Sequence, residues 1–296
     1  MTKKVAFLGL GVMGYPMAGH LSNSGFEVSV YNRTQVKAED WLKQYAGTLA
    51  STPAQAVINA DIVFSCVGED DDVRQVCYGE VGALDAMKPG SVLVDHTTAS
   101  ALLAREINDV CEARQLHFID APVSGGQQGA EHGRLTVMCG GNQTVFDDVL
   151  PVIESYAQTV MLMGPASAGQ LCKMVNQICI AGIVQGLAEG LHFAKSTGLD
   201  AEKVVEVISK GAAQSWQMEN RHLTMLAGEY EHGFAVDWMR KDLGMVLSEA
   251  RENGAQLPIT ALIDQFYADI QAQGRGRWDT SSLLTRLTDN NKTGQR

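Results

Sequence analysis

The chain opens with the stretch KVAFLGLGVMG, residues 4–14. Residues 5–8 are apolar without polar alternation, which is typical of a strand buried on both faces. Gly9, Gly11 and Gly14 follow in a GxGxxG pattern that precedes a helical stretch. In that setting Gly9 permits a tight turn, Gly11 lets the backbone approach a pyrophosphate, and Gly14 lets the helix pack close to the sheet. The pattern predicts a dinucleotide site at the helix N-terminus rather than a plain glycine turn. The residues expected at the cofactor are Gly9, Leu10, Gly11, Val12, Met13 and Gly14.

The residues up to Gly164 alternate short β-rich runs with helical stretches. Strands with no polar alternation, separated by helices, predict a mostly parallel, doubly wound sheet covered on both faces. Thr52 followed by Pro53 marks one helix start, because Thr is a good N-cap and Pro suits the first helical position. We therefore expect an N-terminal α/β Rossmann domain at residues 1–164. The runs expected to form strands are 4–8, 27–31, 61–67, 91–95, 117–120, 135–139 and 159–163.

The pattern changes after Gly164-Pro165. Convincing strand patterns stop there, and long helical patterns continue to the C-terminus. Gly198 is a suitable C-cap for the first of these helices. The sequence thus predicts an all-helical second domain at residues 165–296. Its helices are expected at about 168–197, from 200 onward, and at about 235–253 and 258–273.

The end of the second expected strand bears on the choice of dinucleotide. An NAD site usually has Asp or Glu there for the ribose 2′-hydroxyl. This chain has Asn32, Arg33 and Thr34, with no carboxylate between Glu27 and Glu39. Arg33 offers a fork of donors for a 2′-phosphate, and Thr34 adds a hydroxyl. We expect these three residues at the cofactor and NADP(H) as the favoured cofactor, with NAD(H) as the alternative and no metal. An ordinary exposed loop arginine is the competing interpretation.

Composition argues against several classes of protein. The 296 residues include 34 acidic and 23 basic side chains, a formal net charge of −11. Such a surface repels phosphate backbones, so we expect no nucleic-acid partner, and any bound phosphate needs a local binding device. The six cysteines form no CxxC pair and are predicted to be buried, reduced thiols of a cytoplasmic protein. The N-terminal apolar run is too short for a signal peptide.

The most apolar long segment, about 174–194, contains several polar residues. They favour a buried helix over a membrane span, so we expect no membrane association. The polar residues are Asn176, Gln177, Gln185, Glu189 and His192.

Two further clusters suggest chemistry. Residues 120–126, DAPVSGG, follow an expected strand. The Ser124 hydroxyl and the N–H groups of Gly125 and Gly126 could hold a small carboxylate, although such a loop alone is more often a plain turn. The second cluster is Lys173 and Asn176, three apart and therefore on one face of the long helix.

Lys173 has Leu171, Cys172, Met174 and Val175 as its sequence neighbours. Burying a lysine there is costly unless it has a partner or a task. The start of a helix also disfavours a cation, which suits a group that releases its proton. The alternative is a lysine that lays its stem on apolar surface and keeps its ammonium group in water.

Together these motifs resemble the 3-hydroxyisobutyrate dehydrogenase (β-hydroxyacid dehydrogenase) family, which includes tartronate-semialdehyde, glyoxylate and succinic-semialdehyde reductases. The resemblance extends over essentially the whole chain. Taken alone, Arg240-Lys241-Asp242 would indicate an exposed charge patch, but in this context it matches a family motif. The matched elements are residues 9–14, 120–126, 169–176 and 241–242.

The resemblance implies a role for each matched residue. Lys173 would be the general acid/base, and Asn176 would orient the substrate. The loop Ser124-Gly125-Gly126 would hold the substrate carboxylate. Thr98 is expected at the cofactor and Lys241 near the nicotinamide. Two residues depart from the family pattern: Ser167 stands where another glycine is frequent, and Arg134 replaces a usual threonine and is a candidate determinant of substrate choice.

The resulting hypothesis is reversible hydride transfer between NAD(P)H and a small semialdehyde acid or β-hydroxyacid. The substrate would be of the glyoxylate, succinic semialdehyde, tartronate semialdehyde or 3-hydroxyisobutyrate type, and the enzyme a cytoplasmic homodimer or homotetramer. A non-catalytic dinucleotide sensor or scaffold is the alternative from another class. Within enzymes, the alternatives are activities like those of 6-phosphogluconate dehydrogenase or imine reductases.

Overall fold

The structure, a computed structural model, describes residues 3–293. The chain divides into two compact units, Met1–Lys173 (unit 1) and Met174–Arg296 (unit 2). The long helix α8 (Ala168–Ser196) starts in unit 1 and continues into unit 2. The domain boundary expected at Gly164-Pro165 lies directly before this helix and stays a prediction.

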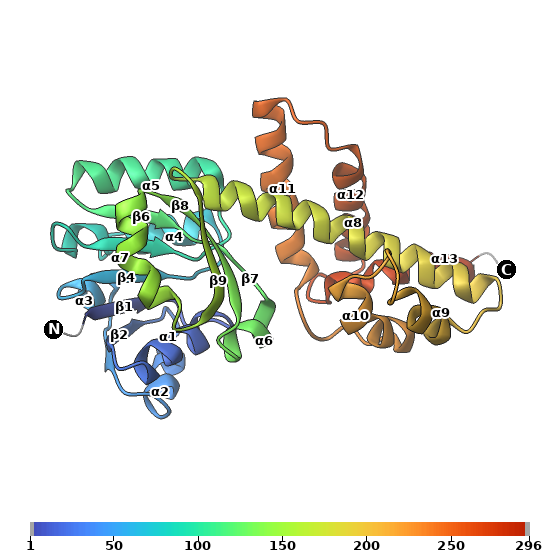
Figure 1. The fold of residues 1–296 in the computed structure, drawn as a ribbon, viewed down its shortest axis with the longest axis horizontal. Coiled ribbons are helices and arrows are strands. Elements are labelled where there is room, and N and C mark those ends of the chain that lie inside the picture. The colour runs from blue at the N-terminus through green and yellow to red at the C-terminus, as the bar shows by residue number, and fades with distance from the viewer. Residues whose placement is uncertain (1–2, 294–296) are drawn as a thin grey trace. The chain divides into compact units, whose positions relative to one another are not determined.

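Unit 1 is built on a nine-stranded sheet (Figure 1). The strand order is β3-β2-β1-β4-β5-β6-β8-β7, and β9 pairs with β8. The first six strands run parallel, whereas β8 is antiparallel to both β6 and β7. The order 3-2-1-4-5-6 is that of doubly wound dinucleotide-binding sheets, so the expected fold class is confirmed. The strands are β1 (Lys4–Leu8), β2 (Glu27–Tyr31), β3 (Thr48–Leu49), β4 (Ile62–Ser65), β5 (Val92–Asp95), β6 (His117–Asp120), β7 (Val123–Ser124), β8 (Leu135–Gly141) and β9 (Ala157–Gly164).

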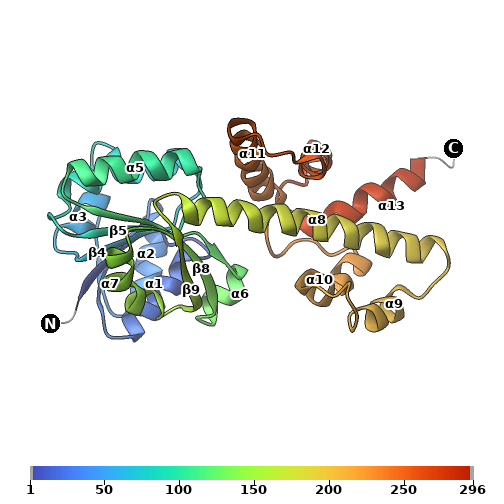
Figure 2. The ribbon, with the colours of Figure 1, turned by 45° about the horizontal axis from the view of Figure 1, so that its top comes forward.

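Helices cover both faces of this sheet, as the two ribbon views show (Figures 1 and 2). Val5 and Phe7 of β1 belong to one apolar core, to which α1, α2 and α7 also contribute. Ala6 and Leu8 belong to a second core with α3, α4 and α5. Burial on both faces explains why these strands show no polar alternation. The helical elements are α1 (Gly14–Asn23), α2 (Gln35–Leu42), α3 (Pro53–Val57), α4 (Asp70–Tyr78), η1 (Leu84–Ala86), α5 (Ala101–Ala113), α6 (Gly126–Glu131) and α7 (Gln143–Ile153).

The local predictions for unit 1 hold in most places. Thr52 caps α3 through a hydrogen bond from the Gln55 N–H, with Pro53 at the first helical position. The seven expected strands are present, but β3 and β7 were missed, because two residues are too few to show a periodic pattern. The six cysteines all lie in the described part of the chain, and none of them forms a disulfide. The expectation that they are buried is wrong for Cys179, which is exposed, and only partly right for Cys66 and Cys172.

Unit 2 is helical, and its described residues contain no strand beyond an isolated bridge between Ala235 and Asp279. The helices α11 and α12 lie side by side in both ribbon views (Figures 1 and 2). Gly198 has a φ of +77° directly after α8, as the predicted C-cap requires. The elements after α8 are α9 (Ala201–Ile208), α10 (Trp216–Ala227), α11 (Val236–Asn253), α12 (Pro258–Ala272), η2 (Thr280–Ser282) and α13 (Leu283–Thr293).

Helix α8 is long and apolar enough to cross a membrane by length and composition. A core helix of a globular protein meets the same criteria, and α8 has the features of one. Ala181, Val184 and Ala188 are buried in the unit 2 core. Gln185 is also buried, and its amide donates to Glu189 at 2.7 Å. A buried amide that donates to a side chain of the same helix suits a protein core.

Candidate functional site

The glycine-rich loop joins β1 to α1. Gly9 has a φ of +103°, and a Cβ there would overlap the carbonyl oxygen of Cys66. A Cβ on Gly14 would overlap the carbonyl oxygen of Gly9 and lie 2.8 Å from the Phe7 ring. Both glycines are therefore required by the protein itself, one for the turn and one for the close approach of α1 to the sheet.

Gly11 differs from its two neighbours. It is not among the glycines with positive φ, and no described atom would lie within 4 Å of its Cβ. Nothing in the described part of the chain thus requires a glycine here. The open space lies just before the N-terminus of α1, where free N–H groups and the helix dipole favour an anion. The loop therefore fits the pyrophosphate of a dinucleotide, which would take the space that a side chain would fill.

Asn32, after β2, holds this loop in shape. Its Oδ1 accepts a hydrogen bond from the Leu10 N–H at 2.8 Å, and its Nδ2 donates to the Thr34 carbonyl at 2.8 Å. The side chain thereby links the glycine-rich loop to the turn before α2. Both of these hydrogen bonds are made within the protein, and the expected contact of Asn32 with the cofactor stays a prediction.

Arg33 lies at the same edge of the sheet, with a side chain that is 75% exposed. Its Nη1 donates to Oδ1 of Asp72, in the first turn of α4, at 2.8 Å. The remaining guanidinium donors can face a ligand, while the Asp72 carboxylate would compete with an added phosphate. Thr34 is the N-cap residue of α2 and makes no side-chain cap hydrogen bond there.

Hydrogen bonds connect the end of β5 and the loop after it to β4 and the segment that follows β4. Oδ1 of the buried Asp95 accepts from Ser65 Oγ at 2.7 Å and from the Thr97 N–H at 3.1 Å. Thr97 Oγ1 in turn accepts from the Val67 N–H at 3.0 Å. Burial raises the pKa of Asp95 to about 6, although its hydrogen bonds favour the charged form. Thr98, half-buried, is thus held at the carboxyl edge of the sheet.

The loop expected to hold a carboxylate connects β7 to α6. Gly125 and Gly126 have φ values of +124° and +62°, which side-chain-bearing residues rarely adopt. Ser124 is half-buried and pairs with Thr136 of β8. The backbone of Arg134 passes close by, since its carbonyl oxygen would lie 3.7 Å from a Cβ on Gly125, and its side chain is exposed.

Lys173 is buried, with 7% of its surface exposed. Gln170 and Asn176 lie three residues before and after it on α8, so the three side chains share one helix face. Asn176 Nδ2 donates to Gln177 Oε1 at 2.8 Å. The burial of Lys173 argues against a lysine that merely extends its ammonium group into water.

In unit 2, Lys241 lies on α11. Its Nζ is 3.3 Å from Oδ1 of Asp242 and 5.5 Å from the centroid of the Trp238 ring. Asp242 is 2% exposed and accepts from Gln177 Nε2 at 2.6 Å through Oδ2. Interpreting residues 240–242 as an exposed charge patch is therefore wrong, because Asp242 is buried and joins α11 to α8.

Sequence reasoning assigned no role to several polar residues that organise the site, although Gln170 and Asp242 lie in stretches that match the family pattern. Asp72 faces Arg33, and Gln170 and Asp242 contact residues far away in the sequence. One signal was available, since Asp95 and Asp120 each end an apolar strand, where a carboxylate needs a hydrogen-bonding partner.

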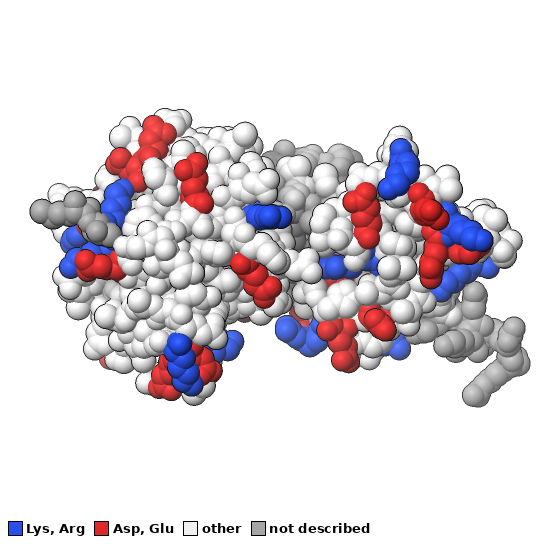
Figure 3. Space-filling view, turned by 60° about the horizontal axis from the view of Figure 1, so that its bottom comes forward, with Lys and Arg blue, Asp and Glu red and all other residues white. Residues whose placement is uncertain are grey.

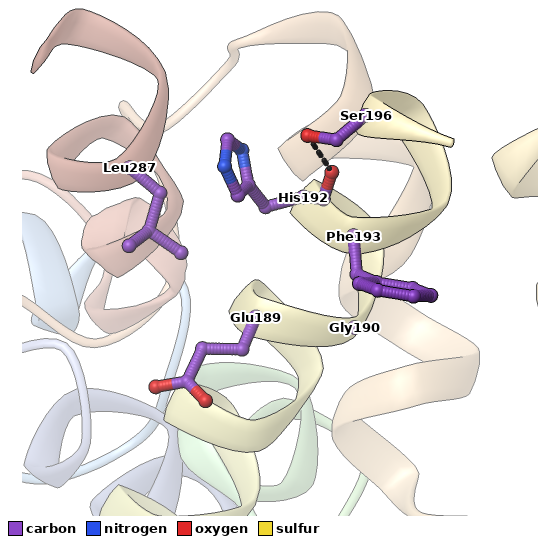
Figure 4. Close-up of a pocket in the computed structure, with 6 residues that line it drawn as sticks. All are labelled: Glu189, Gly190, His192, Phe193, Ser196 and Leu287. Atoms are coloured by element: carbon purple, nitrogen blue, oxygen red, sulfur yellow. Dashed lines mark hydrogen bonds between the residues drawn. The ribbon is translucent and has the colours of Figure 1, made fainter. Parts of the chain in front are cut away.

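Charged side chains and a hollow also lie outside this site. On the face in Figure 3, acidic and basic side chains lie in small mixed groups among uncharged residues. Within residues 3–293, no group of three or more His, Cys, Asp or Glu could hold a metal ion. A hollow in unit 2 lies between the last turns of α8 and Leu287 of α13 (Figure 4). In it the Ser196 hydroxyl donates to the His192 carbonyl, and none of the residues predicted for the site lines it.

Two family descriptions match the chain. Residues 4–164 match the NAD binding domain of 6-phosphogluconate dehydrogenase. Residues 167–287 match the family described as NAD-binding of NADP-dependent 3-hydroxyisobutyrate dehydrogenase.

Individual relatives are similar over nearly the full chain. An uncharacterized oxidoreductase of Shewanella frigidimarina is 65% identical over 96% of this chain and 98% of its own. The 2-hydroxy-3-oxopropionate reductase of Escherichia coli is 32% identical, over 96% of this chain and 97% of its own. Among solved structures, Mycobacterium tuberculosis 3-hydroxyisobutyrate dehydrogenase with L-serine has a TM-score of 0.88 at 28% identity, covering 97% of this chain and 99% of its own.

The glycine-rich loop leads to a first prediction. Gly11→Ala should weaken dinucleotide binding without lowering stability, because the added methyl group meets open space in the protein but would meet a bound pyrophosphate. Overpacking of one contact costs about 1–3 kcal/mol, so the Kd values for NADH and NADPH should rise about 5- to 150-fold in fluorescence titrations. The Tm should stay within about 2 °C of wild type.

Gly14→Ala is the matched control, because its Cβ would overlap the protein itself. It should lower the Tm by several degrees. If Gly11→Ala binds both dinucleotides as tightly as wild type, no phosphate lies against this loop.

Proposed function

Because the chain belongs to the 3-hydroxyisobutyrate dehydrogenase family of NAD(P)-dependent β-hydroxyacid dehydrogenases, we propose that it transfers hydride reversibly between NADP(H) and a small semialdehyde acid or β-hydroxyacid. The observation that carries the proposal is the buried Lys173, on the same face of α8 as Gln170, whose side chain contacts the loop 97–99 at the carboxyl edge of the sheet. Ligands of open α/β sheets bind at this edge.

Lys173 acts as the general acid/base in this proposal. When bound, the nicotinamide supplies or accepts the hydride at the substrate carbon. In reduction, the Lys173 ammonium group gives a proton to the developing alkoxide, which leaves as an alcohol. In oxidation, the neutral amine takes the alcohol proton. The apolar sequence neighbours of Lys173 and its burial support this role, because burying a lysine is costly unless it has a partner or a task.

The other candidate residues bind and orient in the same scheme. Ser124, Gly125 and Gly126 hold the substrate carboxylate through the hydroxyl and backbone N–H groups. Asn176 orients the substrate from the face of α8 that carries Lys173. Thr98 contacts the cofactor, and Lys241 lies near the nicotinamide.

The compounds named for the relatives support the proposed substrate class. The compounds named for them are 3-hydroxyisobutyrate, 2-hydroxy-3-oxopropionate and L-serine. All three carry a carboxylate and an alcohol or aldehyde at the β carbon. A panel of glyoxylate, succinic semialdehyde, tartronate semialdehyde, 3-hydroxyisobutyrate and serine, each assayed with both cofactors, tests the proposal directly. Turnover of none of them, with NADPH bound, would favour a sensor or scaffold instead.

We also propose a soluble, cytoplasmic homodimer or homotetramer. The related dehydrogenases and the core character of α8 support solubility. Sedimentation of the purified protein tests the oligomeric state.

The second prediction concerns Lys173. Lys173→Met removes the proton donor, and kcat should fall about 10²–10⁴-fold, the usual contribution of a positioned acid/base group. The Kd for NADPH, measured by fluorescence titration, should change less than about threefold. Lys173→Arg should not restore activity, because a guanidinium does not release its proton near neutral pH. Retention of kcat by Lys173→Met within about threefold would refute the mechanism.

The third prediction concerns the carboxylate loop. Removing one hydrogen bond to a charged group costs about 1.5–3 kcal/mol, so Ser124→Ala should lower kcat/KM for the acid substrate about 10- to 100-fold. NADPH affinity should be nearly unchanged. A neutral aldehyde analogue serves as the control substrate and should already be poor for wild type. Comparable kcat/KM for the acid and its neutral analogue in wild type would rule this loop out as the site that binds the substrate carboxylate.

The fourth prediction concerns cofactor choice. If Arg33 binds the 2′-phosphate, Arg33→Ala should lower kcat/KM with NADPH by about 10-fold or more and spare activity with NADH. Asp72→Asn is the matched variant and should strengthen the preference for NADPH, because it removes the carboxylate that holds Arg33 and repels the phosphate. Equal losses with both cofactors in Arg33→Ala would mean that Arg33 only supports the loop.

A further inference from the structure

A carboxylate from the sheet anchors the first turn of α8. Asp120, at the end of β6, is fully buried. Its Oδ1 accepts from the Ser167 N–H at 2.7 Å, and its Oδ2 accepts from the Gln170 N–H at 2.8 Å. These are N–H groups that a helix start leaves without partners in the helix. Burial raises the pKa of Asp120 to about 7, although both hydrogen bonds favour the charged form.

Small residues let this turn lie directly on the sheet. A Cβ on Gly169 would overlap the Met138 carbonyl oxygen and lie 2.8 Å from Asp120 Oδ2. A Cβ on Gly140 would overlap Asp120 Oδ1. Ser167, the residue before α8, has a φ of +80°, a conformation that glycine adopts more readily than serine. The turn is therefore held by both packing and hydrogen bonds.

Gln170 extends from this anchored turn to the loop after β5. Its side chain is 1% exposed. Oε1 accepts from the Ala99 N–H at 3.1 Å, and Nε2 donates to the Thr97 carbonyl at 2.8 Å. One amide thus clamps the backbone on both sides of Thr98. Lys173 lies one helical turn further along the same face.

We propose that Gln170 is a positioning residue for the reaction: its amide clamps residues 97–99 to the first turn of α8 and so sets where Lys173 stands at the cofactor edge of the sheet. The inference rests on the proposed function, because Gln170 acts through Lys173. No other uncharged side chain of similar length has both the donor and the acceptor that the clamp uses. Without the donor and the acceptor of the Gln170 amide, the Ala99 N–H and the Thr97 carbonyl lose the hydrogen-bond partners that buried polar groups need.

The test begins with Gln170→Met, which keeps the side-chain volume and removes both hydrogen bonds. Since a small misplacement of a catalytic group can cost up to about 100-fold, kcat should fall about 10- to 100-fold. The KM for the acid substrate should change less than about threefold, because the Ser124 loop is untouched. Gln170→Glu keeps an acceptor for the Ala99 N–H, so its kcat should fall less than that of Gln170→Met. It serves as a second variant if Gln170→Met folds poorly.

A double-mutant cycle separates positioning from a general structural effect. If Gln170 acts through Lys173, adding Gln170→Met to Lys173→Met should cause no further loss of the residual kcat. If Gln170→Met lowers kcat in the Lys173→Met background by the same factor as in wild type, Gln170 acts independently of Lys173, which would overturn the inference. Wild-type kcat in Gln170→Met, beside a large loss in Lys173→Met, would overturn the inference and leave the proposed function intact. Wild-type kcat in Lys173→Met would instead refute the acid/base role proposed for Lys173, and the inference with it.

Hydrogen exchange tests the clamp without any turnover. In Gln170→Met, the Ala99 amide should exchange faster than in wild type. Gln185→Met is the matched control, since Gln185 is a buried glutamine of the same helix that bonds Glu189 instead. It should leave both the exchange at Ala99 and kcat within about twofold of wild type. Unchanged exchange at Ala99 in Gln170→Met would show that the clamp does not hold the loop, and would overturn the inference.

Discussion

The hydrogen bonds from the Ser167 and Gln170 N–H groups to the Asp120 carboxylate connect the sheet to the helix that carries Lys173. Every distance between that lysine and the cofactor edge depends on this connection. A helix start has N–H groups without helical partners, and a buried carboxylate has oxygens without water. Each group satisfies the other, so neither can move away without leaving a buried polar group unpaired.

The parallel sheet makes the rest of the site possible. Because parallel strands end at one edge, the segments after β1, β2, β4, β5 and β6 meet there. Side-chain hydrogen bonds then connect neighbouring segments: Asn32 to Leu10, Thr97 to Val67, and Gln170 to Thr97. Most of these bonds run from a side chain to a backbone group. They therefore fix the shape of the loops and leave the space beside Gly11 and the exposed side chain of Arg33 open to a ligand.

The chain has to hold an anionic cofactor although its net charge is −11. It does so with local features rather than with a basic surface. The N-terminus of α1 offers free N–H groups beside Gly11, and Arg33 offers a guanidinium at the end of β2. Asp72 both orients Arg33 and opposes a phosphate beside it. If Arg33 contacts the cofactor as proposed, the balance between these two effects, rather than the arginine alone, bears on the choice between NAD and NADP.

The sequence by itself determined the features that depend on local backbone geometry and periodicity. These include the roles of Gly9 and Gly14, the buried parallel strands, the Thr52 cap, and a long helix with Lys173 near its start. Only the tertiary structure decided which polar side chains meet. Asp72 lies 39 residues from Arg33, Asp120 lies 50 from Gln170, and Thr97 lies 73 from Gln170. Such pairs produce no periodic pattern in the sequence. Strand order and helix packing, rather than local spacing, bring the two residues of each pair within hydrogen-bonding distance.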